Sequence, residues 1–177
     1  GVRARGAIAE WTPRAKVVDR CVSATDLKRA DVVAALNHPA VLGLPAYAGG
    51  KAEGFLFPAT YDIEPGTGAV DALTMMTQKF AEEAALADLD GGAHALGLTP
   101  YDVVKIASLV EAETPLDADR AKVARVVLNR LAKKMPLQLD STVNYLRQQK
   151  KARLSNADIS VASPYNTYQH VGLPPTP

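Results

Sequence analysis

The chain has 177 residues, of which 47% are hydrophobic and 22% charged. This composition excludes a disordered or collagen-like protein and allows one packed core with a small attachment. The formal net charge of +1 excludes the strong positive field typical of nucleic-acid-binding proteins. Cys21 is the single cysteine and the three histidines are far apart, so an intrachain disulfide is excluded and neither a metal nor a cofactor is predicted.

The first fifty residues are expected to be mainly helical. One helix should begin after Thr12-Pro13, because the apolar residues that follow recur at helical spacing. A second short helix, capped by Asp26, should extend to about Leu36. The proline and glycine residues of 38–50 then indicate a loop.

Two further elements are expected before residue 92. The aromatic-rich segment 53–61 predicts a short extended piece that either lines the core or binds a ligand, and 64–66 should form a turn. Apolar residues at helical intervals predict a helix over 69–89. The pair Gly91-Gly92 is expected to end that helix.

The clearest helix signal lies at residues 100–113. Thr99 is a suitable cap and Pro100 suits the first helical position. Pro115 disfavours helical geometry at the residue before it, so the helix should end at about Glu113. Its broad apolar arc predicts that the helix is largely buried.

Two carboxylates, Glu111 and Glu113, lie on the margins of that apolar arc. The negative end of the helix dipole and partial burial both favour the protonated form of such a group, as a general acid requires. The alternative is structural, with the glutamates capping a neighbouring element or pairing with Arg120 or Arg125. Both interpretations remain open at this point.

Glu111 and Glu113 cannot be the carboxylate pair of an ordinary retaining glycosidase, because residues two apart on a helix diverge by roughly 200°. If one of them acts, either a distant carboxylate assists or the substrate supplies its own nucleophile. Asp140 and Glu53 are the candidates for the distant carboxylate.

The second half of the chain is expected to provide a helix and a polar groove. Acidic residues at its start and lysines at its end predict a helix over 117–134. Residues 137–140 alternate as in a short strand, which would leave Gln138 and Asp140 on one side. The segment 163–175 reads as an irregular polar and aromatic loop, a mixture suited to binding sugars.

Five blocks of the second half share a combined pattern. They are LTPY at 98–101, ASLVEAET at 107–114, KVA with LNRL in 122–131, MPLQLDSTV at 135–143, and SPYNTY with GLPP in 163–175. Together they resemble the YceG-like endolytic murein transglycosylase family, MltG. The segment EGFLFPATY at 53–61 fits the same pattern, so the resemblance covers residues 51–175.

The resemblance implies a peptidoglycan lytic transglycosylase that cleaves the β-1,4 bond between N-acetylmuramic acid and N-acetylglucosamine. The product is a 1,6-anhydro-muramyl end, made by one glutamate acting as acid and then as base. In related enzymes a small hydroxyl residue follows the catalytic glutamate, which favours Glu113-Thr114 over Glu111-Ala112. We therefore predict Glu113 as catalytic and Glu111 as supporting. The predicted substrate-binding residues are Glu53, Gln138, Asp140, Thr142, Tyr165, Asn166 and Tyr168.

The same resemblance predicts an α+β, mostly helical fold: a lysozyme-like transglycosylase domain with short β elements. Residues 51–177 should form the catalytic domain, truncated at its C-terminus. Residues 1–50 should form a helical segment that could be the remnant of a LysM-like module. No apolar run approaches the roughly 18 residues of a membrane span, so a membrane anchor would have to precede this chain.

The implied location is the extracytoplasmic face of a bacterial membrane. The implied partners are peptidoglycan glycan strands, with penicillin-binding-protein synthases as further candidates and no nucleic acid. Two rival functions stay open: a muramidase-type hydrolase of similar fold, and a noncatalytic module that binds peptidoglycan or acts as a scaffold.

Overall fold

The computed structural model describes residues 4–7, 14–147 and 153–177. It contains two compact units, Gly1–Tyr101 and Asp102–Pro177. The chain passes from one to the other in the first turn of a helix, whereas the predicted division lay at residue 50. That division followed the extent of the family resemblance, and it stays a prediction.

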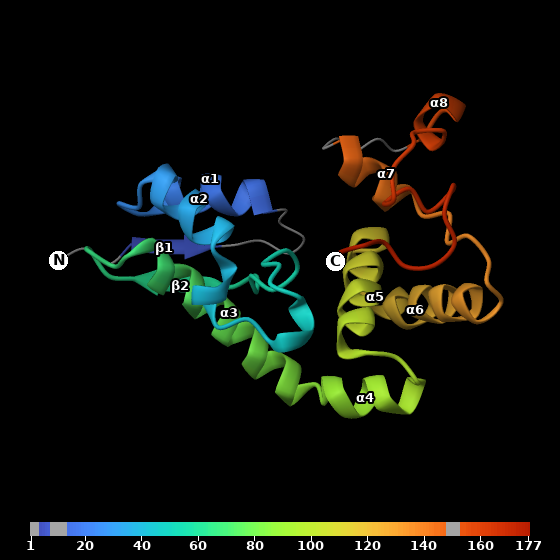
Figure 1. The fold of residues 1–177 in the computed structure, drawn as a ribbon, viewed down its shortest axis with the longest axis horizontal. Coiled ribbons are helices and arrows are strands. Elements are labelled where there is room, and N and C mark those ends of the chain that lie inside the picture. Colours follow the sequence, from blue (N-terminus) through green and yellow to red (C-terminus); the bar gives the residue numbers. More distant parts are fainter. Residues whose placement is uncertain (1–3, 8–13, 148–152) are drawn as a thin grey trace. The chain divides into compact units, whose positions relative to one another are not determined.

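The first unit is built around three helices (Figure 1). They are α1 Arg14–Ala24, α2 Arg29–Asn37 and α3 Ala69–Leu86, with the 3-10 turns η1 Pro39–Leu42 and η2 Ala46–Ala48 between the last two. Their apolar faces form one core that includes Val17, Cys21, Val32, Leu36, Leu42, Leu73 and Met76. The helical spacing of these residues was correctly predicted except for Leu42, which belongs to a 3-10 turn within the predicted loop of 38–50. The Thr12-Pro13 start signal lies outside the described residues.

The second predicted helix begins later than expected. Residue Lys28 precedes its first turn and makes no side-chain cap. Asp26 is therefore not the cap of α2. Instead, the backbone N–H of Leu27 donates to the hydroxyl of Thr25 at 3.1 Å, which forms a tight turn between α1 and α2.

The β structure of the described residues is one two-stranded antiparallel sheet. Strand β1 Ala4–Ala7 pairs with β2 Thr60–Ile63, with Ala4 opposite Ile63. The extended segment predicted over 53–61 is thus a strand only at its end. The fold is mostly helical with short β elements, as expected.

The part of the 53–61 segment that precedes β2 fills the core of the first unit. Phe55 is fully buried. Its ring lies 4.9 Å from Phe80 in an edge-on arrangement and 6.1 Å from Tyr101 in a stacked one. For Phe55, the core-lining interpretation of this segment is the correct one.

The prediction that Gly91-Gly92 ends the long helix is wrong. Helix α3 stops at Leu86, and both glycines lie inside α4 Leu89–Leu96. The break is made by Asp88, which has a left-handed backbone (φ 49°) and accepts the N–H of Gly91 with its side chain at 3.3 Å. A Cβ at residue 91 would lie 2.3 Å from the Asp88 carboxylate. Gly91 is therefore explained by the close approach of this cap.

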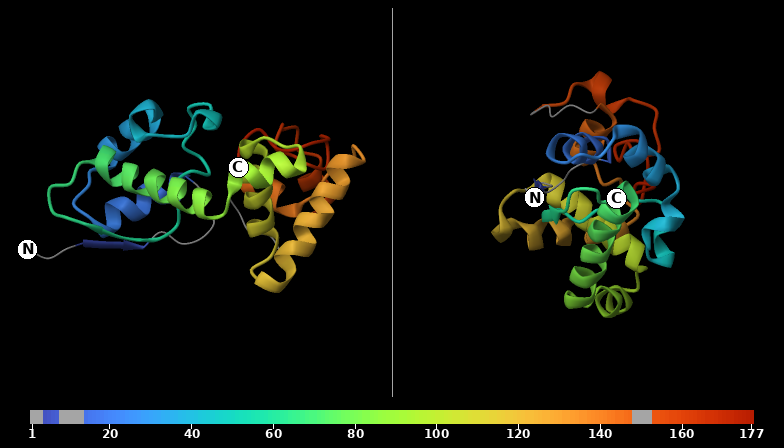
Figure 2. Two further views of the ribbon diagram at one scale, coloured as in Figure 1. Left: turned by 90° about the horizontal axis from the view of Figure 1, so that it is seen from below. Right: turned by 90° about the vertical axis from the view of Figure 1, so that its left-hand side faces the viewer.

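The second unit contains four helices in its described part. They are α5 Pro100–Glu113, α6 Asp117–Ala132, α7 Asp140–Arg147 and α8 Asn156–Ile159. The views in Figure 2 show α5 and α6 as consecutive helices with different axes. Helix α5 ends at Glu113 as predicted, and the hydroxyl of Thr114 accepts the N–H of Leu116 at 3.1 Å, closing a turn around Pro115. None of the helices in the described ranges has the length and apolar character that crossing a membrane requires.

The short strand predicted over 137–140 is wrong. Only an isolated bridge between Pro136 and Val171 forms there. Gln138 has a left-handed backbone (φ 52°), which interrupts the alternation on which the prediction rested, and Asp140 already begins α7. Gln138 and Asp140 are therefore not neighbours on one face of a strand.

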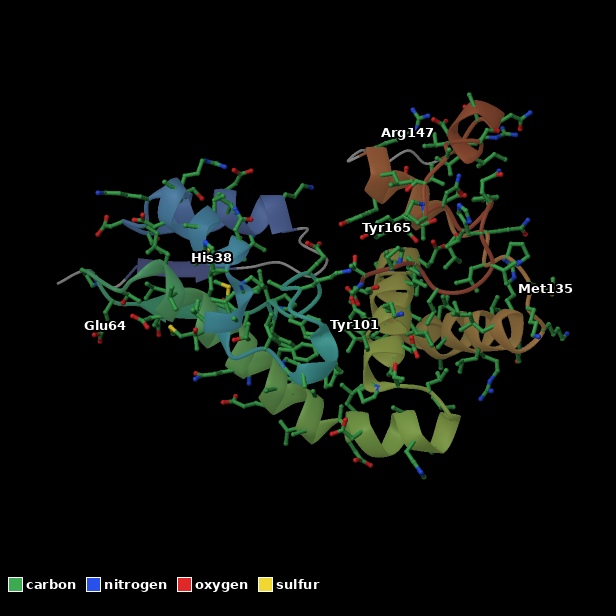
Figure 3. All side chains as sticks on the ribbon, viewed as in Figure 1. His38, Glu64, Tyr101, Met135, Arg147 and Tyr165 are labelled. Atoms are coloured by element: carbon green, nitrogen blue, oxygen red, sulfur yellow. The ribbon has the colours of Figure 1, made fainter. Side chains whose placement is uncertain are left out.

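An ion pair joins α7 to α8. Arg147, which closes α7 (Figure 3), donates to the Asp158 carboxylate at 2.9 Å. Asp158 is almost fully buried and also accepts the N–H and hydroxyl of Ser155 in a capping box. A buried carboxylate with three donors is well compensated, so this pair holds the two short helices together.

Candidate active site at the start of helix α7

Glu113 lies between the ends of two helices. It is the last residue of α5, and its Oε1 accepts the backbone N–H of Ser141, in the first turn of α7, at 3.2 Å. The carbonyl end of α5 presents negative partial charge to this carboxyl, and the N–H end of α7 presents positive partial charge. The sequence suggested only the first influence. The second arises from a contact across 28 positions of the chain.

Glu111 has a different environment. Its Oε2 lies 3.0 Å from Nη2 of Arg120, and Arg120 also reaches Asp117 at 3.3 Å. The sequence left open a structural role for the glutamates, including an ion pair with Arg120. That ion pair is present for Glu111. Within the part of the chain that the structure describes, no cation forms an ion pair with Glu113. Of the two, Glu113 is thus the one free of a guanidinium partner.

Asp140 and Tyr168 form a pair next to this carboxylate. The phenol of Tyr168 donates a short hydrogen bond to Oδ1 of Asp140, the residue before Ser141. Burial first, then this hydrogen bond and the charges of Asp140 and Glu113, raise the pKa of Tyr168 to about 12, against an opposing effect of Arg130. Tyr168 is therefore a neutral hydrogen-bond donor, and it lies close enough to Glu113 to feel its charge.

Tyr168 should make stability fall at high pH. Because its folded-state pKa of about 12 lies above the ordinary value of 10.0, the phenol adds stability that is complete below pH 10 and is lost as the pH rises toward 12. Tyr168→Phe should remove this loss, as urea unfolding of the two proteins at several pH values between about 9 and 12 would measure. The pKa of Tyr61, in the first unit, is also raised to about 12. Tyr61→Phe is therefore the matched comparison for a tyrosine outside the site. Identical pH slopes in wild type and Tyr168→Phe would contradict the assignment.

A buried network of hydroxyls fixes the approach to α7. The Thr142 hydroxyl donates to the Leu139 carbonyl at 2.8 Å and lies 3.0 Å from the Thr167 hydroxyl, which accepts the Leu139 N–H at 2.9 Å. The N–H of Gln138 donates to the Thr167 carbonyl at 3.0 Å. The backbone groups of Gln138 and Leu139 that these contacts involve are thereby satisfied inside the protein. These contacts favour a supporting role for Thr142, and its assignment to substrate binding stays a prediction.

Asn166 is also turned inward. The residue is 0% exposed. Its amide donates to the carbonyls of Ile159 at 2.9 Å and Val161 at 2.8 Å, and its Oδ1 accepts the N–H of Tyr168 at 3.0 Å. Asn166 therefore shapes the loop that presents Tyr168, and direct contact with a sugar stays a prediction for it.

The remaining predicted binding residues are more open. Tyr165, labelled in Figure 3, is half-buried, its ring lies 5.4 Å from that of Tyr145 in a tilted arrangement, and its hydroxyl lies 2.9 Å from that of Thr176. The side chain of Gln138 is exposed. Glu53 belongs to the first unit, and its predicted role stays a prediction. Among the described residues, no cluster of three His, Cys, Asp or Glu side chains is suited to a metal ion.

Three residues of the site were missed from the sequence. Ser141 supplies the N–H to Glu113, Thr167 ties the segment before α7, and Arg130 of α6 donates to the Leu137 carbonyl. Each contact involves a backbone group, and those of Ser141 and Thr167 join residues 28 positions apart. The only available signal was their presence in the blocks that carried the family resemblance.

These features describe a helical domain that presents one carboxylate between two helix ends, beside an acid–phenol pair. The model of the YceG-like family matches residues 4–177, and the chain therefore belongs to the YceG-like family. The match begins well before residue 51, so the first fifty residues fall within the family as well.

Two curated relatives are named endolytic murein transglycosylase. The chain is 39% identical to the one from Bacillus subtilis over 126 residues, which is 71% of this chain and 34% of the relative. It is 35% identical to one from Streptococcus pneumoniae over 153 residues, or 81% of this chain and 27% of the relative. The chain thus spans about a third of the length of these relatives.

A crystal structure has the same fold. It is described as that of a yceG-like protein from Listeria monocytogenes, and it matches with a TM-score of 0.85 and 30% sequence identity. The match covers 99% of this chain and 62% of that chain.

Proposed function

We propose that this chain carries the catalytic centre of an endolytic lytic transglycosylase that cuts peptidoglycan glycan strands, with Glu113 as the single acid and base. The relatives named endolytic murein transglycosylase support the reaction class. The observation that carries the assignment is the placement of Glu113, which accepts the Ser141 N–H beside the Asp140–Tyr168 pair while Glu111 is bound to Arg120. In this proposal the site has the lysozyme-like arrangement expected from the sequence.

The proposed reaction uses the Glu113 carboxyl twice. In its protonated form it donates a proton to the oxygen between N-acetylmuramic acid and N-acetylglucosamine, and the C1–O bond breaks with its electron pair going to that oxygen. The muramyl 6-hydroxyl oxygen then bonds to C1, and its proton returns to the Glu113 carboxylate. The acid is regenerated, no water is consumed, and a 1,6-anhydro end is formed.

Glu113 suits both halves of this cycle because it receives opposing influences. The α5 carbonyl end supports the neutral acid that the first step needs. The Ser141 N–H supports the carboxylate that the second step needs. Tyr168, a donor held neutral by its raised pKa, and the Asp140 carboxylate could both bind sugar hydroxyls next to the reacting bond.

Asp140 also favours one rival function. A second carboxylate next to Glu113 is what a hydrolase needs to activate a water molecule, as a muramidase-type enzyme would. The phenol of Tyr168 already donates to Oδ1 of Asp140, and the relatives that the chain matches are named transglycosylases. We therefore favour the transglycosylase over the hydrolase.

Product masses separate the two reactions. The full-length protein, incubated with purified glycan strands, should release fragments with anhydro-muramyl ends, which mass spectrometry detects as fragments lighter by one water than hydrolysis products. Reducing ends would assign the hydrolase. Binding of the strands without any cleavage would assign the noncatalytic glycan-binding or scaffold role.

The wider setting follows from this reaction. Its substrate lies outside the cytoplasm, so the enzyme would act at the extracytoplasmic face of the membrane. Termination of growing glycan strands is the proposed cellular role, which makes peptidoglycan synthases candidate partners. A LysM-like origin of residues 1–50 and a catalytic domain that extends beyond this chain belong to the same proposal.

A further inference from the structure

Ser141 has an unusual side chain for its position. The residue is 8% exposed, in the first turn of α7, and its backbone N–H donates to Oε1 of Glu113 at 3.2 Å. Its hydroxyl oxygen is enclosed and has no hydrogen-bond partner among the residues that the structure describes. A buried hydroxyl without a partner is costly, so its retention here calls for an explanation.

The backbone contact favours one carboxyl oxygen over the other as the carrier of the proton. An N–H group can only donate, so Oε1 of Glu113 must offer a lone pair to Ser141 in both protonation states. The carbonyl oxygen of a protonated carboxyl is a better acceptor than its hydroxyl oxygen, so this contact favours the arrangement with the proton on Oε2.

The hydroxyl of Ser141 has a suitable acceptor close by. Three covalent bonds separate a serine hydroxyl oxygen from its own backbone nitrogen, and rotation about χ1 moves it between staggered positions around that nitrogen. The carboxylate of Glu113 is the group that this nitrogen already holds. Once Glu113 has given up its proton, its oxygens gain charge and become stronger acceptors.

We propose that Ser141 is a positioning residue for Glu113, holding Oε1 with its N–H throughout and donating its hydroxyl to the carboxylate formed after the first proton transfer. This inference rests on the proposed role of Glu113. It assigns the buried hydroxyl to the charged state that occurs only during the reaction. The hydroxyl then contributes to turnover and not to the stability of the resting protein.

Ser141→Ala in the full-length protein tests this role. The variant keeps the N–H and loses only the hydroxyl, so kcat for release of anhydro-muramyl fragments should fall by about tenfold to a hundredfold, as expected for a lost hydrogen bond to a charged group. KM should stay nearly unchanged. Since the hydroxyl has no partner in the resting site, Tm should be unchanged or higher. Ser141→Thr, which keeps a hydroxyl, should recover most of kcat.

A matched control uses the same substitution on the Glu113 helix. The hydroxyl of Ser108 donates to the Lys105 carbonyl of α5 at 2.7 Å, so Ser108→Ala should keep wild-type kcat. Full kcat in Ser141→Ala would overturn the inference, as would a loss of kcat that follows a loss of Tm. If wild type gives no cleavage, the proposed function itself fails. If Glu113→Gln is inactive while Ser141→Ala keeps full activity, the proposed function stands and the proposed role of Ser141 fails.

Discussion

Replacing Glu113 with glutamine is expected to lower the rate of glycan cleavage by about a hundredfold to ten-thousandfold, the usual cost of removing a general acid and base. Glutamine retains the shape of the side chain, and its carbonyl oxygen can still accept the N–H of Ser141. It cannot transfer a proton. The fold should therefore persist, with Tm close to that of wild type, while the release of anhydro-muramyl fragments is lost.

Glu111→Gln is the matched control for this experiment. It lies on the same helix and makes the same chemical change, but it removes an ion pair to Arg120 whose side chains are 26% and 37% exposed. Such partly exposed pairs contribute little, so activity should fall only partly, through loss of the ion pair that joins α5 to α6. Full activity in Glu113→Gln with loss in Glu111→Gln would reverse the assignment.

Asn166→Asp is expected to be the most destabilising of the conservative substitutions in the second unit. The amide of Asn166 donates to two backbone carbonyls and the residue is 0% exposed. A carboxylate of the same shape cannot donate, so both carbonyls would be left facing a buried charge. The loss should be on the order of 3 kcal/mol or more, a fall in Tm of roughly 10 °C by thermal unfolding.

Gln169→Glu provides the comparison. The Gln169 amide donates to the same Ile159 carbonyl at 3.0 Å, but at an exposed position. Water can replace this bond, so the change in stability should stay within about 0.5 kcal/mol. Equal and small effects in both variants would show that Asn166 does not hold the loop. Aspartate retains an oxygen that can accept the N–H of Tyr168, so activity in Asn166→Asp should fall only as far as the loop that presents Tyr168 is displaced.

The parts of the fold that were predictable depend on local signals. Proline at residues 100 and 115 sets the two ends of α5, since both act on the backbone next to them. The end of α3 depends instead on Asp88. Its left-handed backbone interrupts the helical path, and its side chain caps the next helix, α4, which contains the glycine pair. At Gln138 a left-handed residue similarly replaced the predicted strand. In both places one unusual backbone angle outweighed a pattern spread over several residues.

The site was predictable only as a set of residue types. Asp140, Tyr168 and Glu113 do come together, through Ser141 and the short phenol bond. Thr142 and Asn166 have the same polar character in the sequence, yet their side chains satisfy backbone groups of an irregular segment. A sequence does not distinguish a polar group that waits for a ligand from one that replaces a missing backbone bond, because the difference lies in contacts between distant residues.

The donor to the Glu113 carboxylate is a main-chain group, and this affects how the site can evolve. Point mutations exchange side chains, so every residue type except proline at position 141 retains that N–H. Most substitutions at residue 141 would therefore preserve this hydrogen bond, whereas most substitutions of a side-chain donor would remove the bond that it makes. Mutations elsewhere that shift the start of α7 would remove it. The contact therefore depends on Thr142, Thr167 and the other residues that fix the helix start more than on the side chain of residue 141.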